Sequence, residues 1–275
     1  MKKQFTLFLL LLITGVSLGQ KAAYETKANI KYYPEASYHG DVYKAERCVL
    51  DVYYPKDKKG FATILWFHGG GITGGSKEIP EYLKEKGYCI IGVGYRLHPN
   101  VKAPTYIEDA AAAVSWAFTN IAKYGGDPSL IFLSGHSAGG YLNLMVGLDK
   151  QYLAKYNIDA NKIAGLVPLS PQCVTHYTVR KEQGLPDKQP TIDKYAPLYH
   201  VRGDAPPLLL ITGDRELELL GRYEENAYMA RMMKINGHPD TTLYELDGYG
   251  HNNMPDGGYP LLLKEVARIV SLRKK

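Results

Sequence analysis

The sequence predicts an α/β fold in which a mostly parallel central sheet carries helices on both faces. Two observations support this prediction. Short, almost wholly apolar runs recur along the chain, and longer amphipathic segments separate them. Apolar runs of this length are typical of strands buried on both faces of a parallel sheet. Strands and helices in alternation favour a sheet that is covered on both sides.

Seven segments are expected to form the strands. The first, RCVLDVYYP at 47–55, alternates apolar and polar residues, as a strand with one exposed face does. The next five are continuous apolar runs, and the last is more mixed. In chain order they span 62–69, 88–95, 130–136, 162–170, 207–214 and 241–249.

Four segments with helical spacing of apolar residues lie between or after these strands. The expected helices span 104–125, 138–156, 221–238 and 258–272. The segment 171–206 departs from the alternation, because it is polar, contains prolines and is only weakly periodic. We expect it to form a lid-like excursion over the sheet edge, since long loops in compact domains often act as lids or binding loops.

Composition and charge narrow the function classes. The chain has 275 residues, enough for one large domain with a substantial core. Its 33 basic and 28 acidic residues are spread along the chain, and the net charge of +5 includes no basic block. This pattern argues against a nucleic-acid or membrane-binding surface. Three cysteines, Cys48, Cys89 and Cys173, are too few for a disulfide framework and lack metal-ligand spacing.

The first 19 residues have the pattern of a secretory signal peptide. Lys2 and Lys3 precede an apolar run at 5–13, and small residues follow it. We expect cleavage just before Gln20, which leaves 20–275 as a single domain. The apolar run is short for a transmembrane helix, although an uncleaved anchor is the alternative. No cysteine follows the run, so a lipid anchor is not expected, and the sequence predicts a secreted or periplasmic protein.

A serine flanked by glycines follows one of the apolar runs. In SGHSAGG, Ser137 lies where the strand at 130–136 gives way to the next helix. Gly135 and Gly139 remove the Cβ atoms that would collide in a sharp strand-to-helix turn. The helix N-terminus offers free N–H groups and a positive dipole end to a developing negative charge. This context predicts that Ser137 is a nucleophile.

A glycine run, WFHGGGITGG at 66–75, follows an earlier apolar strand. It lets backbone N–H groups approach a ligand without intervening side chains. Acyl transfer needs such donors aimed at the oxygen that gains charge. The candidate donors for this oxyanion hole are the N–H groups of Gly70, Gly71 and Ala138. The glycine spacing matches neither the Walker nor the dinucleotide-binding loop.

A serine hydroxyl is a poor nucleophile unless a neutral histidine accepts its proton. Of the eight histidines, His68 and His136 belong to the glycine motifs and are expected to shape loops. His251 differs from the others, because it follows the late strand at 241–249 in the segment GYGHNN. We therefore expect His251 to be the base.

Together these motifs resemble the α/β-hydrolase family, in particular the hormone-sensitive-lipase-like and carbohydrate esterases that carry an HGGG motif. GHSAGG is similar to the form found in acetyl and feruloyl carbohydrate esterases and in arylformamidases. The resemblance covers nearly all the chain after the signal and implies an α/β-hydrolase fold with a short lid-like insertion. The segments that carry it are HGGG (68–71), VGYRLHP (93–99), IEDAAAAVSW (107–116), GHSAGG (135–140), SP (170–171) and APPLLLITGD (205–214).

The resemblance also implies a catalytic triad in the chain order nucleophile, acid, histidine. Ser137 would be the nucleophile and His251 the base. In related hydrolases the acid commonly falls three positions after the strand-terminal glycine, which favours Glu216; glutamate can replace aspartate in this role. Asp214 is the alternative and Glu218 the third candidate, and Asp214 also suits a turn or helix-cap position.

The expected function is that of a secreted serine esterase that removes acetyl or feruloyl groups from plant polysaccharides through an acyl-enzyme, with no metal and no cofactor. The substrate would be a small-molecule or oligosaccharide ester. Tyr177, Tyr195 and Tyr199 in the lid-like segment are candidates for lining the acyl or sugar site. Two alternatives remain open: an arylformamidase-like amidase or small peptidase on the same fold, and a catalytically inactive binding module.

Overall fold

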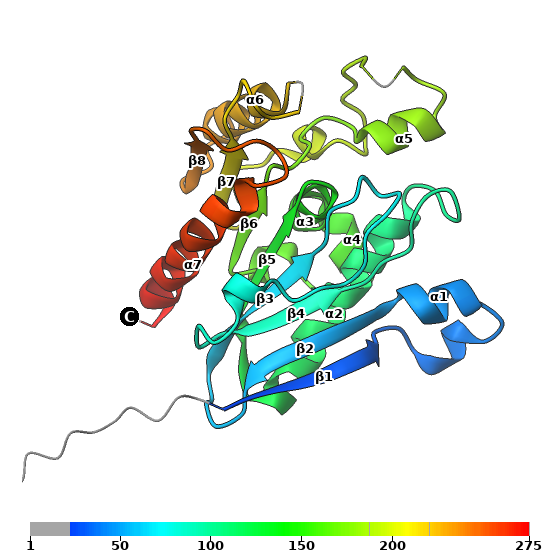
Figure 1. Ribbon diagram of the computed structural model, residues 1–275, viewed down its shortest axis with the longest axis vertical. Coiled ribbons are helices and arrows are strands. Elements are labelled where there is room, and N and C mark those ends of the chain that lie inside the picture. The colour runs from blue at the N-terminus through cyan, green and yellow to red at the C-terminus, as the bar shows by residue number, and fades with distance from the viewer. Residues whose placement is uncertain (1–22, 187, 220, 275) are drawn as a thin grey trace, which may run out of the picture.

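The computed structural model describes residues 23–186, 188–219 and 221–274, and these form a sheet with helices packed on both faces (Figure 1). The sheet has the strand order β1-β2-β4-β3-β5-β6-β7-β8. From β4 to β8 neighbouring strands are parallel, whereas β2 is antiparallel to both β1 and β4. The bounds are β1 Tyr24–Lys31, β2 Val49–Pro55, β3 Phe61–Phe67, β4 Cys89–Val93, β5 Gly126–His136, β6 Gly165–Leu169, β7 Leu208–Gly213 and β8 Thr241–Leu246.

The helices divide between the two faces of the sheet. Side chains of α2, α3, α4 and α6 share one apolar core with the strands, and α7 packs in a second core on the other face. The predicted α/β class with helices on both faces is therefore confirmed. The bounds are α1 Val42–Arg47, α2 Thr105–Tyr124, α3 Ala138–Leu148, α4 Lys150–Ala154, α5 Tyr177–Glu182, α6 Arg222–Ile235 and α7 Met254–Arg273, with 3-10 turns at Glu35–Tyr38, Glu81–Leu83, Ala160–Lys162 and Pro197–His200.

Strand β3 shows why the predicted strands are apolar throughout. Leu65 and Phe67 point into the core shared with α2 and α3, while Ile64 and Trp66 point into the core shared with α7. Because successive side chains of a strand alternate between faces, a strand covered on both sides needs apolar residues at every position.

Strand β1 and the helix expected at 138–156 differ from the sequence-based expectation, and the short helices α1 and α5 were not predicted. Strand β1 was not predicted, because YETKANIK is polar and mostly exposed at the sheet edge. The single helix expected at 138–156 is interrupted at Asp149, whose side chain accepts a hydrogen bond from the N–H of Gln151 and caps α4. A cap residue in a non-helical conformation ends one helix and begins the next.

The lid-like segment 171–206 is held against the rest of the chain by hydrogen bonds. Its helix α5 contacts the glycine loop, where Thr178 Oγ1 donates to the Gly71 carbonyl at 2.6 Å. The Glu182 carboxylate accepts from the Ala103 N–H at 2.8 Å. In Figure 1 the segment lies at the same end of the molecule as α6.

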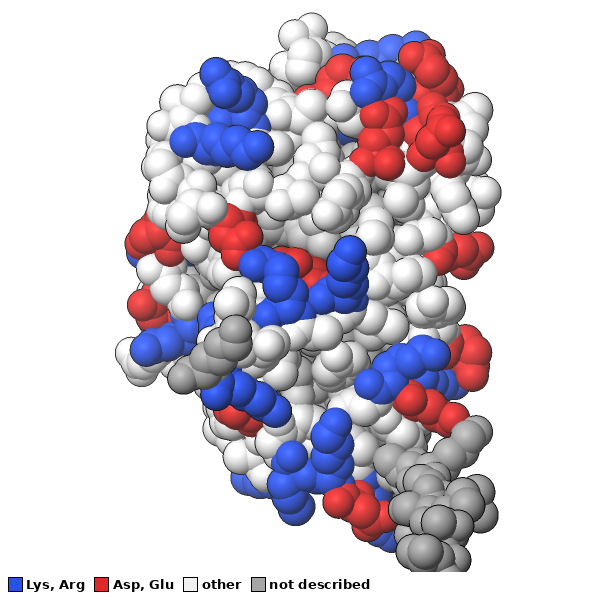
Figure 2. Space-filling view, turned by 90° about the vertical axis from the view of Figure 1, so that its left-hand side faces the viewer, with Lys and Arg blue, Asp and Glu red and all other residues white. Residues whose placement is uncertain are grey.

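The remaining sequence-based expectations concern the cysteines, the charges and the N-terminus. All three cysteines are free and buried. Figure 2 shows Lys and Arg side chains in separate small groups, with Asp and Glu among them, on the face that it draws. The expected signal peptide, residues 1–19, lies outside the described residues. Within the described part of the chain, no helix combines the length and the apolar character that crossing a bilayer requires.

Candidate active site

Ser137 occupies a strained turn between β5 and α3. Its φ of 56° and ψ of −114° are unusual for a residue with a side chain. Such a conformation costs on the order of 1–3 kcal/mol, which the surrounding structure must offset. A Cβ atom on Gly139 would overlap the Phe67 carbonyl oxygen, and one on Gly135 would lie 2.6 Å from it. The two glycines therefore let the turn pack directly against the end of β3.

The structure brings Ser137 and His251 together. His251 lies in the loop between β8 and α7, and its Nε2 is 2.9 Å from Ser137 Oγ. With its proton on Nδ1, the imidazole accepts a hydrogen bond from the serine hydroxyl. His136 supports this loop, because its Nε2 donates to the His251 carbonyl at 3.0 Å.

The acid that contacts the imidazole is Glu218. His251 Nδ1 donates to Glu218 Oε2 at 2.7 Å. The other carboxylate oxygen accepts from Ser170 Oγ at 2.6 Å and from the Gly213 N–H at 3.1 Å. Burial alone would raise the pKa of Glu218, but the hydrogen bonds from His251, Ser170 and Gly213 outweigh it and lower the pKa to about 2. Glu218 is therefore ionised throughout the neutral range.

The prediction that Glu216 contacts the histidine is wrong. Glu216 is exposed, and the Glu218 N–H donates to the Asp214 carbonyl at 2.8 Å, so residues 214–218 form one helical turn. That turn returns residue 218 to the end of β7 and directs residue 216 outward. The alternative acid, Asp214, joins two loops instead, because its carboxylate accepts from the N–H groups of Glu216 and Gly248 at 2.9 and 3.0 Å.

Ser170 is a site residue that sequence reasoning missed, since SP at 170–171 served only as a landmark of the resemblance. It follows β6 with a φ of 47°, and its Oγ lies 3.1 Å from His251 Nδ1 as well as contacting Glu218. Arg222 Nη1 donates to the Ser170 carbonyl and lies 3.4 Å from its Oγ. Arg222 is a buried residue at the start of α6, and its spacing gave no signal of this contact.

The glycine loop lies beside the nucleophile. A Cβ atom on Gly69 would lie 3.7 Å from Ser137 Cβ, and Gly70 and Gly71 both have positive φ, at 107° and 63°. Ala138 is the first residue of α3, so its N–H has no acceptor within the helix. The three N–H groups predicted to form an oxyanion hole thus belong to segments that adjoin Ser137.

The side chains of His68 and His136 contact the loops around the site and not the Ser137 hydroxyl. The His68 ring stacks on Tyr95 with 4.2 Å between centroids, and its Nδ1 is 2.7 Å from the Gly69 carbonyl. Burial lowers the pKa of His68 to about 4. Burial, together with the neighbouring His251, lowers the pKa of His136 to about 4 as well. Both rings are neutral at pH 7 and hold the two loops around the nucleophile.

A cavity of about 790 Å³ lies next to this site, between the lid-like segment and α6. Of the three predicted tyrosines, Tyr177 lines it, and its hydroxyl occupies the space that a Cβ on Gly71 would need. Tyr195 and Tyr199 are not among the lining residues. The Tyr195 carbonyl accepts a hydrogen bond from Tyr141, and the Tyr199 ring is largely exposed. The structure does not place these two side chains at the cavity.

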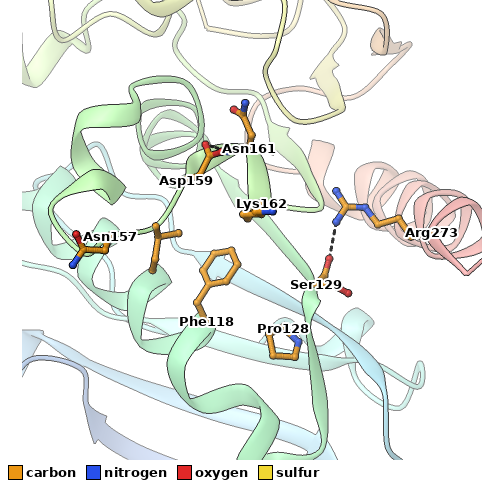
Figure 3. A pocket seen from close by; sticks show the side chains of 9 residues that line it. Phe118, Pro128, Ser129, Asn157, Asp159, Asn161, Lys162 and Arg273 are labelled. Carbon is orange, nitrogen blue, oxygen red and sulfur yellow. Dashed lines mark hydrogen bonds between the residues drawn. The ribbon is translucent and has the colours of Figure 1, made fainter.

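A second cavity, of about 710 Å³, lies at the opposite end of β5 (Figure 3). Its lining includes Ser129 and Arg273, which are joined by a hydrogen bond from Arg273 Nη1 to the Ser129 carbonyl at 2.7 Å. Ser129 and His136 are seven residues apart on one strand, about 23 Å at 3.3 Å per residue. This cavity is therefore separate from Ser137.

Among the described residues, no group of three or more His, Cys, Asp and Glu side chains is arranged to hold a metal ion. What the geometry does assemble is a hydrogen-bonded chain of a strained serine, a histidine and an ionised glutamate at the carboxyl ends of parallel strands. Along the sequence the order is serine, glutamate, histidine. This arrangement on a mostly parallel sheet is that of the α/β-hydrolase fold.

Comparisons with known proteins place esterases among its relatives. A family model described as BD-FAE matches residues 50–165. Esterase LipC of Mycobacterium tuberculosis is 28% identical over 228 residues, which cover 74% of this chain and 56% of LipC. The probable carboxylic ester hydrolase LipM of the same organism is 24% identical over 240 residues, covering 76% and 55%. The chain thus spans about half the length of these relatives.

Solved structures share the fold over most of the chain. A truncated carbohydrate esterase from gut microbiota superposes with a TM-score of 0.73 at 18% identity, covering 91% of this chain and 98% of that one. Esterase 2 of Thermogutta terrifontis, phosphoramylated by tabun, gives a TM-score of 0.69 at 22% identity, covering 92% and 95%. These likenesses confirm the α/β-hydrolase fold.

Proposed function

We propose that the protein is a serine carboxylic-ester hydrolase. The observation that carries the proposal is the continuous hydrogen-bonded chain from Ser137 Oγ through His251 to Glu218, with distances of 2.9 and 2.7 Å. The glycine loop beside it supplies backbone donors at the position where acyl transfer develops negative charge. The named esterases among the relatives support the same reaction class.

The reaction proceeds in two acyl-transfer steps. Ser137 Oγ attacks the ester carbonyl carbon while His251 Nε2 accepts its proton, and the N–H groups of Gly70, Gly71 and Ala138 bind the resulting oxyanion. The bond to the alcohol oxygen breaks as His251 returns the proton to that oxygen. Water then attacks the acyl-enzyme, again losing a proton to His251, and the acid product leaves as Ser137 regains its hydrogen. Glu218 holds the imidazole with its proton on Nδ1.

Replacement of the nucleophile tests the mechanism. Ser137→Ala should lower kcat for p-nitrophenyl acetate by roughly 10⁴- to 10⁶-fold, because triad members act as a unit. Ser129→Ala, an exposed serine at the far end of the same strand, is the matched control and should keep normal turnover. Labelling by a fluorophosphonate probe should occur in the wild type and be lost in Ser137→Ala. An unlabelled wild type without turnover would instead favour an inactive binding module.

The finer part of the proposal is that the enzyme hydrolyses the ester bonds that link acetyl or feruloyl groups to a plant polysaccharide. The BD-FAE match and the likeness to a carbohydrate esterase support this substrate class. A panel of acetylated xylan, feruloylated oligosaccharides and p-nitrophenyl acetate tests it with purified protein. Hydrolysis of p-nitrophenyl acetate without release of acetate or ferulate from the carbohydrates would remove the carbohydrate assignment and leave the esterase.

We also propose that the protein is exported. The support is the sequence pattern of residues 1–19, two lysines followed by an apolar run and small residues. Expression of the full chain in a bacterial host should yield a periplasmic or extracellular product whose N-terminus is Gln20. A cytoplasmic product that retains Met1 would contradict the export proposal.

A further inference from the structure

The cavity next to the triad is bordered by exposed apolar side chains from three separate parts of the chain. Ile192 comes from the lid-like segment, Leu219 from the turn after β7 and Tyr228 from α6. They are 50%, 45% and 51% exposed, yet they converge on one concavity. Large apolar side chains that gather in a cavity while open to solvent mark a binding site more often than scattered ones do.

The buried part of the lining holds both apolar and polar residues, and several of its charged groups are bound to the backbone. Val174 and Leu198 are buried in the lining. Arg180 donates to the Gln189 carbonyl at 2.6 Å, and Arg222 donates to the Ser170 carbonyl. The Glu225 carboxylate accepts from two backbone N–H groups, those of residues 173 and 174. The two other charged lining residues, Lys188 and Glu224, are of opposite sign. Because the lining mixes both signs and engages three of its charges internally, it favours a neutral occupant over an ionic one.

Two of the residues that line the cavity contact groups of the candidate active site. Leu219 directly follows Glu218, and its N–H donates to Glu218 Oε2 at 3.1 Å. The hydroxyl of Tyr177, a second lining residue, packs on the Cα of Gly71, one of the candidate oxyanion donors. The cavity therefore adjoins both the acid of the triad and the glycine loop that carries the candidate oxyanion donors.

We propose that this cavity binds a hydrophobic group of the ester, an aryl ring or an alkyl chain larger than acetyl, and so sets which esters the enzyme prefers. The inference rests on the proposed esterase function. The volume of about 790 Å³ lies within the range of roughly 300–1,000 Å³ typical of small-molecule sites. A two-carbon acetyl group would leave most of it empty, whereas an aromatic ring or a longer chain fills more of the apolar space.

Two ester series locate the group that enters the cavity. In one, p-nitrophenyl esters grow from acetate to butyrate to octanoate and 3-phenylpropanoate, so that only the acyl group changes. In the other, acetate esters grow from methyl to benzyl to naphthylmethyl, so that only the alcohol changes. We expect kcat/KM to rise about tenfold or more along one series, since each methylene in a hydrophobic pocket contributes strongly to discrimination. The series that rises identifies the acyl or the alcohol side.

Variants connect that preference to the cavity. Tyr228→Ala and Ile192→Ala should each lower the ratio of kcat/KM for the large ester to that for the acetate about fivefold or more. The ratio cancels any loss of folded enzyme. Tyr244→Ala, an exposed tyrosine on β8 outside the cavity, is the control and should leave the ratio unchanged.

The result can separate this inference from the proposed function. An active enzyme, inactivated by Ser137→Ala, whose kcat/KM stays flat in both series would overturn the cavity assignment alone. A size preference that persists in both Tyr228→Ala and Ile192→Ala would overturn it too. Activity that survives Ser137→Ala would overturn the proposed function instead.

Discussion

Exchange of Glu218 for glutamine is the sharpest test of the site, because it changes charge and hydrogen bonding at nearly constant shape. The carboxylate accepts four hydrogen bonds, from Nδ1 of His251, Oγ of Ser170 and the N–H groups of Gly213 and Leu219. An amide offers one oxygen and one NH₂ group. Whichever way the amide turns, its NH₂ group faces two of the four groups that donate to the carboxylate.

The expected loss of turnover follows from the position of the proton on the His251 imidazole. If the amide NH₂ group faces His251, Nδ1 must lose its hydrogen and Nε2 must carry it instead. The ring then points a donor at Ser137 Oγ and is unable to accept the serine proton. If the amide turns the other way, Ser170 and Gly213 lose their acceptor and the imidazolium loses its negative partner. We expect kcat to fall roughly 10³- to 10⁴-fold, the size of effect seen when a triad carboxylate becomes an amide in other hydrolases.

The assay compares Glu218→Gln with Glu216→Gln, two changes of the same kind that are two residues apart. Glu216 is exposed, so its variant should keep kcat for p-nitrophenyl acetate within about twofold of wild type. Circular dichroism and the denaturation midpoint establish that both variants are folded. A large loss in Glu216→Gln combined with near-normal turnover in Glu218→Gln would refute the geometry described above.

Three further predictions concern neighbouring groups. Gly71→Ala should lower kcat about 10²-fold or more, because its Cβ overlaps the Tyr177 hydroxyl and φ is positive, and Tyr177→Phe in the same chain should restore part of the loss. Ser170→Ala removes one hydrogen bond to the acid and should cost about tenfold in kcat, and a loss as large as that of the glutamine variant would contradict this secondary role. The free energy of unfolding, measured by urea titration, should fall as pH drops from about 6.5 to 4. Unfolded histidines take up protons at about pH 6.5, whereas folded His68 and His136 resist protonation until about pH 4, so each contributes up to about 3 kcal/mol of this loss. His136→Gln should weaken the dependence of the unfolding free energy on pH. An unchanged slope would contradict the contribution assigned to His136.

The fold was largely predictable because most of its strands are buried on both faces. The run ATILWFHG covers all of β3 except its first residue. Side chains of β3 alternate between two apolar cores, so its sequence carries the signal on both faces. Strand β1 carries little of that signal, because YETKANIK lies at an exposed edge and is held by pairing with β2. Edge strands depend on their neighbour, and their own composition says little about them.

The site was predictable only where its chemistry is local in the chain. Ser137 and His251 were identified from short motifs, in which glycines and strand ends fix the position of the side chain. Glu218 was ranked below Glu216, because the choice depends on whether residues 214–218 wind into a turn, and that is set by the Asp214 hydrogen bonds to Glu216 and to Gly248 in another loop. Spacing along the chain does not report such a contact.

The contact between α5 and the glycine loop has a consequence for altering this enzyme. Thr178 bonds to the carbonyl of Gly71 and Tyr177 packs on its Cα, so the segment that borders the substrate also supports the backbone that must receive the oxyanion. Grafting a lid from another esterase to change selectivity would remove this brace unless the graft reproduces both side chains. In this chain, the six-residue helix α5 therefore contributes to both substrate selectivity and turnover rate.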